Sequence, residues 1–256
     1  MTRHIDLNSD LGEGFGPYRI ADDATLLSIV SSANIACGEH AGDPLVMDAT
    51  IREALKNNVS LGAHIGFPDR QGFGRRLIPF SQKELELFTI TQLGALSAVA
   101  HYAGGRLTHV NFHGALGNLS FVDAEVAKIL ITAIKAFDPG LAFIGLPHTK
   151  ASLEAEHQGL RLVCSFLADR AYTSEGILVA RNLEGSVIKD HKQVSERVKR
   201  AVMEGEVESI DGKIIKMPVE SILIHSDTAG AVELAQIIKK SVIDCGATIR
   251  SYMSSC

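Results

Sequence analysis

The chain has 256 residues, with 30 acidic, 25 basic and ten histidine side chains, and a formal net charge of -5 when the histidines are neutral. Its 46% share of hydrophobic residues allows a substantial core and excludes a mainly disordered chain. No basic block suits a nucleic acid, and no apolar run reaches the roughly 18 residues of a membrane span, so small molecules and proteins are the expected partners.

The N-terminal residues and the cysteines indicate a cytoplasmic protein. Residues 1–8 lack the apolar segment of a secretory signal, so we expect the chain to stay in the cytoplasm. The four cysteines are far apart and form no CxxC pair, which favours free thiols over a disulfide framework or a zinc ribbon. They are Cys37, Cys164, Cys245 and Cys256.

Short apolar runs alternate with helical patterns along the whole chain, which is typical of βαβ units. Each run is short enough to be a buried parallel strand. The predicted strands are His4–Asn8, Ser32–Ala36, Val59–Ala63, Leu107–Phe112, Leu141–Leu146, Leu160–Phe166, Ser221–His225 and a brief eighth run at Ala247–Arg250.

Capping residues and apolar stripes mark the helices between these strands. Helices are predicted after Asp43-Pro44, after the capping box that begins at Ser81, and along the stripes 126–137 and 231–242. Segment 206–217 contains an Asp-Gly pair between two mixed runs and predicts a hairpin with a two-residue turn. No linker, low-complexity tract or repeat is found, so residues 1–256 are predicted to form one domain.

Polar residues follow nearly every predicted strand. An open sheet concentrates its site at one switch point, whereas a barrel builds its site from the carboxyl ends of many strands. This distribution favours a closed (β/α) barrel of seven or so strands, with its site at one end, over an open sheet. The polar strand ends are Asp6 to Asp10, Asn34 to His40, His64, His109 to His113, Asp169-Arg170 and His225 to Asp227.

The first strand and the loop after it contain several site candidates. Asp6, Asn8 and Asp10 have period two and therefore project to the same side of an extended strand. A carboxylate inside a barrel is costly unless it is paired or liganded, which favours a site role over a structural one. The glycine-rich loop that follows lacks a full GxGxxG pattern, so we interpret it as a flexible active-site loop that carries Glu13.

The next two strand ends add a histidine each. Asn34 and His40 lie where small residues end a strand and open a helix. Cys37 and His40 have a spacing compatible with metal ligation, but no second pair follows, so a proton carrier or hydrogen-bond donor is favoured for His40. His64 begins a loop with Asp69 and the paired arginines 75 and 76, which suit a carboxylate or phosphate; a solvated basic corner is the alternative.

His109 and His113 are four residues apart at the fourth strand. His113 is the first candidate for general acid–base work, whereas His109 is predicted to be a hydrogen-bonded core histidine. Asp169 and Arg170 form either a salt-bridged corner or a pair that orients a substrate carboxylate. His225 could be a base oriented near Asp227. No GxSxG elbow and no Walker motif occur, so neither a serine-hydrolase triad nor a P-loop is indicated.

Seven of these motifs, in order, closely resemble the LamB/YcsF family, whose members are A subunits of a bacterial ATP-dependent 5-oxoprolinase. The resemblance implies a seven-stranded barrel similar to the glycoside hydrolase/deacetylase superfamily. It also implies ATP-dependent opening of 5-oxo-L-proline to L-glutamate with separate B and C subunits, which could themselves bind the ATP. The motifs are Asp6–Gly16, Ser32–Pro44, Gly62–His64, Pro68–Arg76, His113–Leu116, Ala168–Tyr172 and Asp227–Thr228.

The implied chemistry assigns roles to the candidates. A lactam is a poor electrophile, and phosphorylation of its oxygen gives an imidate that water can attack. Asp10 or Glu13 would activate the water, His113 would shuttle the proton, and arginines would hold carboxylate or phosphate. The catalytic candidates are therefore Asp10, Glu13, His113, Asp169, His225 and Asp227. The binding candidates are Asp6, Asn8, Asn34, His40, His64, Asp69, Arg75, Asn111 and Arg170.

The chain departs from the family pattern at several motif positions. Asn111 and Gly117 replace a lysine and a tyrosine, and loss of a lysine that binds an oxyanion costs several kcal/mol of transition-state stabilisation. These changes leave open a non-catalytic subunit or a diverged paralogue with another lactam substrate. A stand-alone metal-dependent deacetylase or amidohydrolase, with His40, His64 and an Asp around a divalent ion, is a further alternative. A homo-oligomer is also compatible with the sequence. The other departures are Glu39, Ile65, Ser165 and Ser226.

Overall fold

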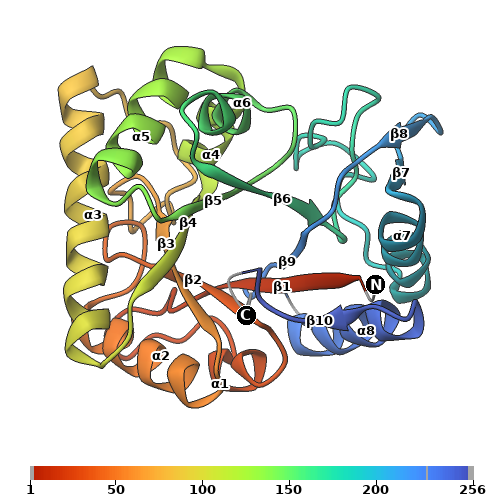
Figure 1. Cartoon of the computed structure of the whole chain (residues 1–256), viewed down its shortest axis with the longest axis horizontal. Coiled ribbons are helices and arrows are strands. Elements are labelled where there is room, and N and C mark those ends of the chain that lie inside the picture. Colours follow the sequence, from red (N-terminus) through yellow and green to blue (C-terminus); the bar gives the residue numbers. More distant parts are fainter. Residues whose placement is uncertain (1–2, 229, 253–256) are drawn as a thin grey trace.

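The computed structural model describes residues 3–228 and 230–252 and contains a closed barrel of parallel strands (Figure 1). The barrel strands are β1 (His4–Leu11), β2 (Ser32–Ala36), β3 (Ser60–Ile65), β4 (Leu107–Phe112), β5 (Ala142–Gly145), β6 (Arg161–Leu167) and β9 (Ser221–Ile224). Each strand pairs with the next, and β1 pairs with both β2 and β9, which closes the ring. The predicted seven-stranded barrel is therefore confirmed.

Two further strand pairings lie outside the ring. The eighth predicted run is present as β10 (Thr248–Ile249), which pairs with the first residues of β1. The predicted hairpin is present as β7 (Glu206–Glu208) and β8 (Ile214–Lys216), which pair antiparallel. The two-residue turn was wrong, because Ser209 and Lys213 are also joined by a backbone hydrogen bond and the connection spans residues 209–213.

Eight helices are described, and they surround the barrel (Figure 1). The predicted Asp43 and Ser81 caps are confirmed, because each side chain accepts a hydrogen bond from a backbone N–H in the first turn of its helix. Across residues 3–228 and 230–252, no helix combines the length and apolar character needed to cross a membrane. The helices are α1 (Asp23–Leu27), α2 (Pro44–Lys56), α3 (Gln82–Tyr102), α4 (Gly114–Val122), α5 (Ala124–Phe137), α6 (Lys150–His157), α7 (His191–Glu204) and α8 (Ala231–Asp244).

Polar side chains form a hydrogen-bonded column inside the barrel. The Asn8 amide donates to Ser221 Oγ (2.5 Å), and the Asn34 amide donates both to Asn8 Oδ1 (2.7 Å) and to Asp10 Oδ1 (2.9 Å). Asp6, below them, accepts hydrogen bonds from Ser31, Ser32 and Ser221. Burial raises the pKa of Asp6 despite these bonds. The period-two spacing in β1 thus places its polar groups on one side, whereas Ile5 and Leu7 join the hydrophobic core.

His109 belongs to the same column and is a core histidine, as predicted. It is completely buried, its Nε2 lies 3.0 Å from Asn34 Oδ1, and its Nδ1 lies 2.9 Å from the Thr108 hydroxyl. Gly62 leaves room for the ring, because a Cβ there would lie 2.0 Å from His109 Nε2. The cysteines Cys37, Cys164 and Cys245 are free thiols, as predicted, and Cys256 lies outside the described residues.

Candidate active site

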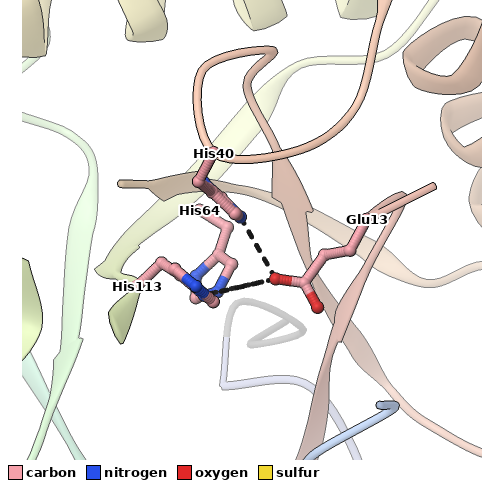
Figure 2. A group of neighbouring side chains, drawn as sticks. All are labelled: Glu13, His40, His64 and His113. Carbon is pink, nitrogen blue, oxygen red and sulfur yellow. Dashed lines mark hydrogen bonds and ion pairs between the residues drawn. The ribbon is translucent and has the colours of Figure 1, made fainter. Parts of the chain in front are cut away.

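Three histidines and one glutamate meet at the carboxyl end of the barrel (Figure 2). Glu13 follows β1, His40 lies in the loop after β2, His64 is in β3, and His113 follows β4. The carboxyl ends of parallel strands meet at one end of a barrel, which brings these separate segments together. All four side chains are buried, and their ligand atoms lie within 4.8 Å of one another.

One carboxylate oxygen is the centre of this cluster. Glu13 Oε1 lies 3.1 Å from His40 Nε2, 3.2 Å from His113 Nδ1 and 3.5 Å from His64 Nε2. Burial alone would raise the pKa of Glu13, but the hydrogen bonds to His113 and His40 and the nearby His64 hold it well below its usual value. Glu13 is therefore an ionised carboxylate at neutral pH.

Two of the imidazoles are neutral at neutral pH. Burial, and then the proximity of His113, lower the pKa of His40 to about 3. Burial also lowers the pKa of His64, which lies 3.6 Å from Asp10. A neutral imidazole has one N–H donor and one lone pair, so the neighbours of each ring decide which nitrogen carries the proton.

The loop after β3 folds closely over the cluster. A Cβ at Gly66 would lie 2.5 Å from His40 Nδ1, and a Cβ at Gly74 would lie 2.8 Å from His40 Cβ and 2.9 Å from His113 Cδ2. Asp69 stabilises the conformation of this loop. Its carboxylate accepts a hydrogen bond from the Gly72 N–H (3.0 Å) and forms an ion pair with Arg76. Asp69 therefore shapes the loop and does not reach the cluster.

A second charged pair lies across the same end of the barrel. His225 Nδ1 is 3.3 Å from Asp169 Oδ2. Burial would lower the pKa of His225, but the Asp169 charge and hydrogen bond outweigh it and raise that pKa. Asp169 thus pairs with His225, and the salt-bridged corner suggested for Asp169 and Arg170 was wrong. Arg75 pairs with Asp227 at 2.5 Å and joins the loops after β3 and β9.

Arg170 is a buried cation with no ion pair among the described residues. Its Nε donates to the Ser186 carbonyl (3.2 Å) and its Nη2 to the Val179 carbonyl (2.6 Å). A guanidinium has five N–H donors, so three remain for other acceptors. Because a buried charge without a counter-ion is unfavourable, this arrangement suits an anionic ligand.

These groups surround a cavity of about 560 Å³. The size suits a small organic molecule. His40 and Asp169 do not line the cavity, but each contacts a residue that does, Glu13 and His225 respectively. The other predicted polar residues of the barrel interior lie deeper: Asp6, Asn8 and Asn34. The predicted site residues that line the cavity are Asp10, Glu13, His64, Arg75, Asn111, His113, Arg170, His225 and Asp227.

The sequence profile of the LamB/YcsF family matches residues 5–255. The chain belongs to this family. It is 51% identical, over 96% of each chain, to a protein of Agrobacterium fabrum whose name describes the A component of a 5-oxoprolinase. It is 47% identical, again over 96% of each chain, to a protein of Pseudomonas syringae with the same description. Its fold is also similar to the crystal structure of a lactam utilization protein from Thermus thermophilus, with a TM-score of 0.93, 38% identity, and coverage of 97% of this chain and 100% of that one.

Three of the departures named in the sequence, Asn111, Gly117 and Ser165, line the cavity, and two of them carry polar side chains. Asn111, at the position of the family lysine, places its Oδ1 2.5 Å from His64 Nδ1 and so positions that ring. Ser165 lines the cavity, and its buried Oγ has no hydrogen-bond partner among the described residues. Both positions therefore place a polar group beside the cavity.

Several residues that shape this site were missed in the sequence. Phe73 accepts a hydrogen bond from His113 Nε2 through its carbonyl (2.7 Å), and Gly66 and Gly74 make room for the rings. The glycine density of residues 62–74 was the available signal. Arg181 lines the cavity from the long connection after β6, where no motif marked it.

Proposed function

We propose that this chain is the A subunit of an ATP-dependent 5-oxoprolinase, which opens the lactam of 5-oxo-L-proline to L-glutamate together with B and C subunits. The main support is one cavity that combines a buried histidine–carboxylate cluster with the unpaired cation of Arg170. The names of the relatives point in the same direction. The cytoplasmic location and a homo-oligomer stay predictions.

The proposed reaction uses ATP to activate a weak electrophile. Transfer of the γ-phosphoryl group to the lactam oxygen gives a phosphorylated imidate and ADP. Water then adds to the imidate carbon, and the C–N bond breaks as the nitrogen takes a proton, which leaves γ-glutamyl phosphate. A second water releases phosphate and L-glutamate. We assign ATP binding to the partner subunits, since the chain has no P-loop motif.

The cluster suits the proton transfers of this reaction. Glu13 and Asp10 are the carboxylates beside the cavity, and His113 lies 3.2 Å from Glu13, within reach of a shared proton. We assign the binding of the substrate carboxylate to Arg170, the buried cation without an ion pair among the described residues. Arg75 can bind phosphate only in competition with Asp227, its present partner.

The test is an assay of ATP-dependent glutamate release from 5-oxoproline, with the chain alone and with B and C subunits. We expect release only with the partners. His113→Ala should abolish release without unfolding the chain, because the His113 side chain makes no capping hydrogen bond to α4. His157→Ala, which changes an exposed surface histidine, is the matched control. Near-normal release by His113→Ala would remove His113 from the mechanism.

The histidine cluster also favours a second candidate, a stand-alone metal-dependent deacetylase or amidohydrolase. Three imidazoles beside a carboxylate are a common ligand set for hydrolytic metal ions. This candidate predicts amide or ester cleavage by the chain alone, without ATP. No glutamate release under any condition, together with such cleavage, would replace the 5-oxoprolinase proposal.

A further inference from the structure

The hydrogen bonds around His113 and His64 turn one ring nitrogen of each residue toward the other. His113 Nε2 lies 2.7 Å from the Phe73 carbonyl, which only accepts, so this nitrogen carries a proton and Nδ1 is the nitrogen that faces the cluster. His64 Nδ1 lies 2.5 Å from Asn111 Oδ1, which places its lone pair on Nε2. His64 Nε2 and His113 Nδ1 are only 2.9 Å apart. Two ring nitrogens at this distance need a proton or a metal ion between them.

The Glu13 carboxylate adds a third electron-rich group at the same point. Its Oε1 lies 3.1 Å from His40 Nε2, 3.2 Å from His113 Nδ1 and 3.5 Å from His64 Nε2. The cluster is buried, so water cannot screen these groups from one another. Three arginines line the cavity, Arg75, Arg170 and Arg181, and none of them forms an ion pair with Glu13 among the described residues.

We propose that Glu13, His40, His64 and His113 hold a divalent transition-metal ion of the zinc type. In a tetrahedral zinc site, bonds of about 2.0–2.1 Å place neighbouring ligand atoms about 3.3 Å apart. Four of the six ligand-atom separations, 2.9, 3.1, 3.2 and 3.5 Å, bracket this value, and all six lie within 4.8 Å. Three imidazole nitrogens and one carboxylate oxygen suit Zn²⁺ or Co²⁺, whereas Mg²⁺ and Ca²⁺ prefer oxygen ligands.

Contacts behind the ligands support the assignment. His64 is oriented by Asn111 Oδ1, and His113 by the Phe73 carbonyl, as metal-binding histidines usually are by an acceptor on the far nitrogen. Glu13, His64 and His113 also line the cavity, so a ligand in the cavity reaches the ion. An ion there would polarise a carbonyl oxygen or activate water. This inference does not depend on which lactam or amide is the substrate.

The test measures metal binding directly and needs no turnover. Untagged full-length chain is stripped with a chelator and titrated with Zn²⁺ or Co²⁺; binding is followed by elemental analysis and, for Co²⁺, by visible absorption. We expect one ion per chain. His64→Ala and the near-isosteric Glu13→Gln should each weaken binding by about 100-fold or more, whereas the exposed-histidine variant His157→Ala should bind as the unaltered chain does.

The outcomes separate a metal centre from a cluster that shares protons only. Substoichiometric uptake by the folded, unaltered chain would overturn the proposal, as would equal affinity in folded Glu13→Gln. Circular dichroism establishes folding, and Glu13→Gln keeps the test decisive if His64→Ala fails to fold. One bound ion per chain without 5-oxoproline turnover would support the metal centre and refute the proposed function. Turnover of 5-oxoproline by metal-free chain with its partners would support the proposed function and refute the metal centre.

Discussion

Replacement of Gly66 by alanine should displace His40 and impair activity. The added Cβ would lie 2.5 Å from His40 Nδ1 and 2.9 Å from His40 Cγ, whereas carbon atoms pack at about 3.5–4.0 Å. The ring must therefore move by roughly 1 Å. The ring of His40 stacks on His113 with centroids 4.0 Å apart, so it cannot move without disturbing its neighbours.

The structure gives a magnitude for both activity and stability. A shift of this size breaks the 3.1 Å contact between His40 Nε2 and Glu13, and a displacement of about 1 Å near a reacting group lowers rates by about 100-fold. Overpacking costs about 1–3 kcal/mol of unfolding free energy. The Gly66 N–H still donates to Gln92, so the loss would not come from the backbone.

The assay is glutamate release by the assembled enzyme, together with urea unfolding of the isolated chain. Gly94→Ala is the matched control, since a Cβ in that part of α3 meets nothing within 4 Å and should stabilise the helix by up to about 1 kcal/mol. If Gly66→Ala keeps unaltered release and stability, the close packing of this loop on His40 has no functional importance and the reasoning is refuted.

Two further predictions concern stability. Tyr172→Phe should lower the unfolding free energy by about 1–3 kcal/mol in urea titrations, because the buried Tyr172 hydroxyl accepts the Leu167 N–H (2.8 Å); an unchanged midpoint would contradict this. Burial raises the pKa of Asp23 from 3.8 to about 6, so the unfolded chain releases this proton first and the folded state loses stability as pH rises from 3.8 to about 6. Asp23→Asn keeps an acceptor for the Gly12 N–H and should therefore be more stable than the unaltered chain by up to about 3 kcal/mol above about pH 6, with the gain falling as pH drops from 6 and absent below about pH 3; a pH-independent difference would count against it.

Local patterns in the sequence predicted most of the barrel. The strands Ser32–Ala36 and Leu107–Phe112 have the predicted bounds, because apolar runs between turn residues report burial directly. Four helices, α1, α4, α6 and α7, were not predicted. α1 has five residues and α6 eight, and α4 contains two glycines, so their amphipathic signal is weak. α7 is different, because its buried residues Val194, Val198, Ala201 and Val202 have helical spacing in a polar sequence, a signal that was available and was missed.

The sequence alone was enough to predict which end of the barrel contains the candidate active site. Polar residues at the carboxyl ends of the strands placed His64, His113 and Glu13 near one another, because parallel strands share a direction. The tertiary structure decided the partners. Three contacts depend on loop conformations and on closure of the barrel: His40 faces Glu13, Asp169 pairs with His225 instead of its neighbour Arg170, and ring nitrogens of His64 and His113 meet at 2.9 Å. Such contacts join residues 27 to 56 positions apart, and a pattern that repeats every two or four residues contains no information about them.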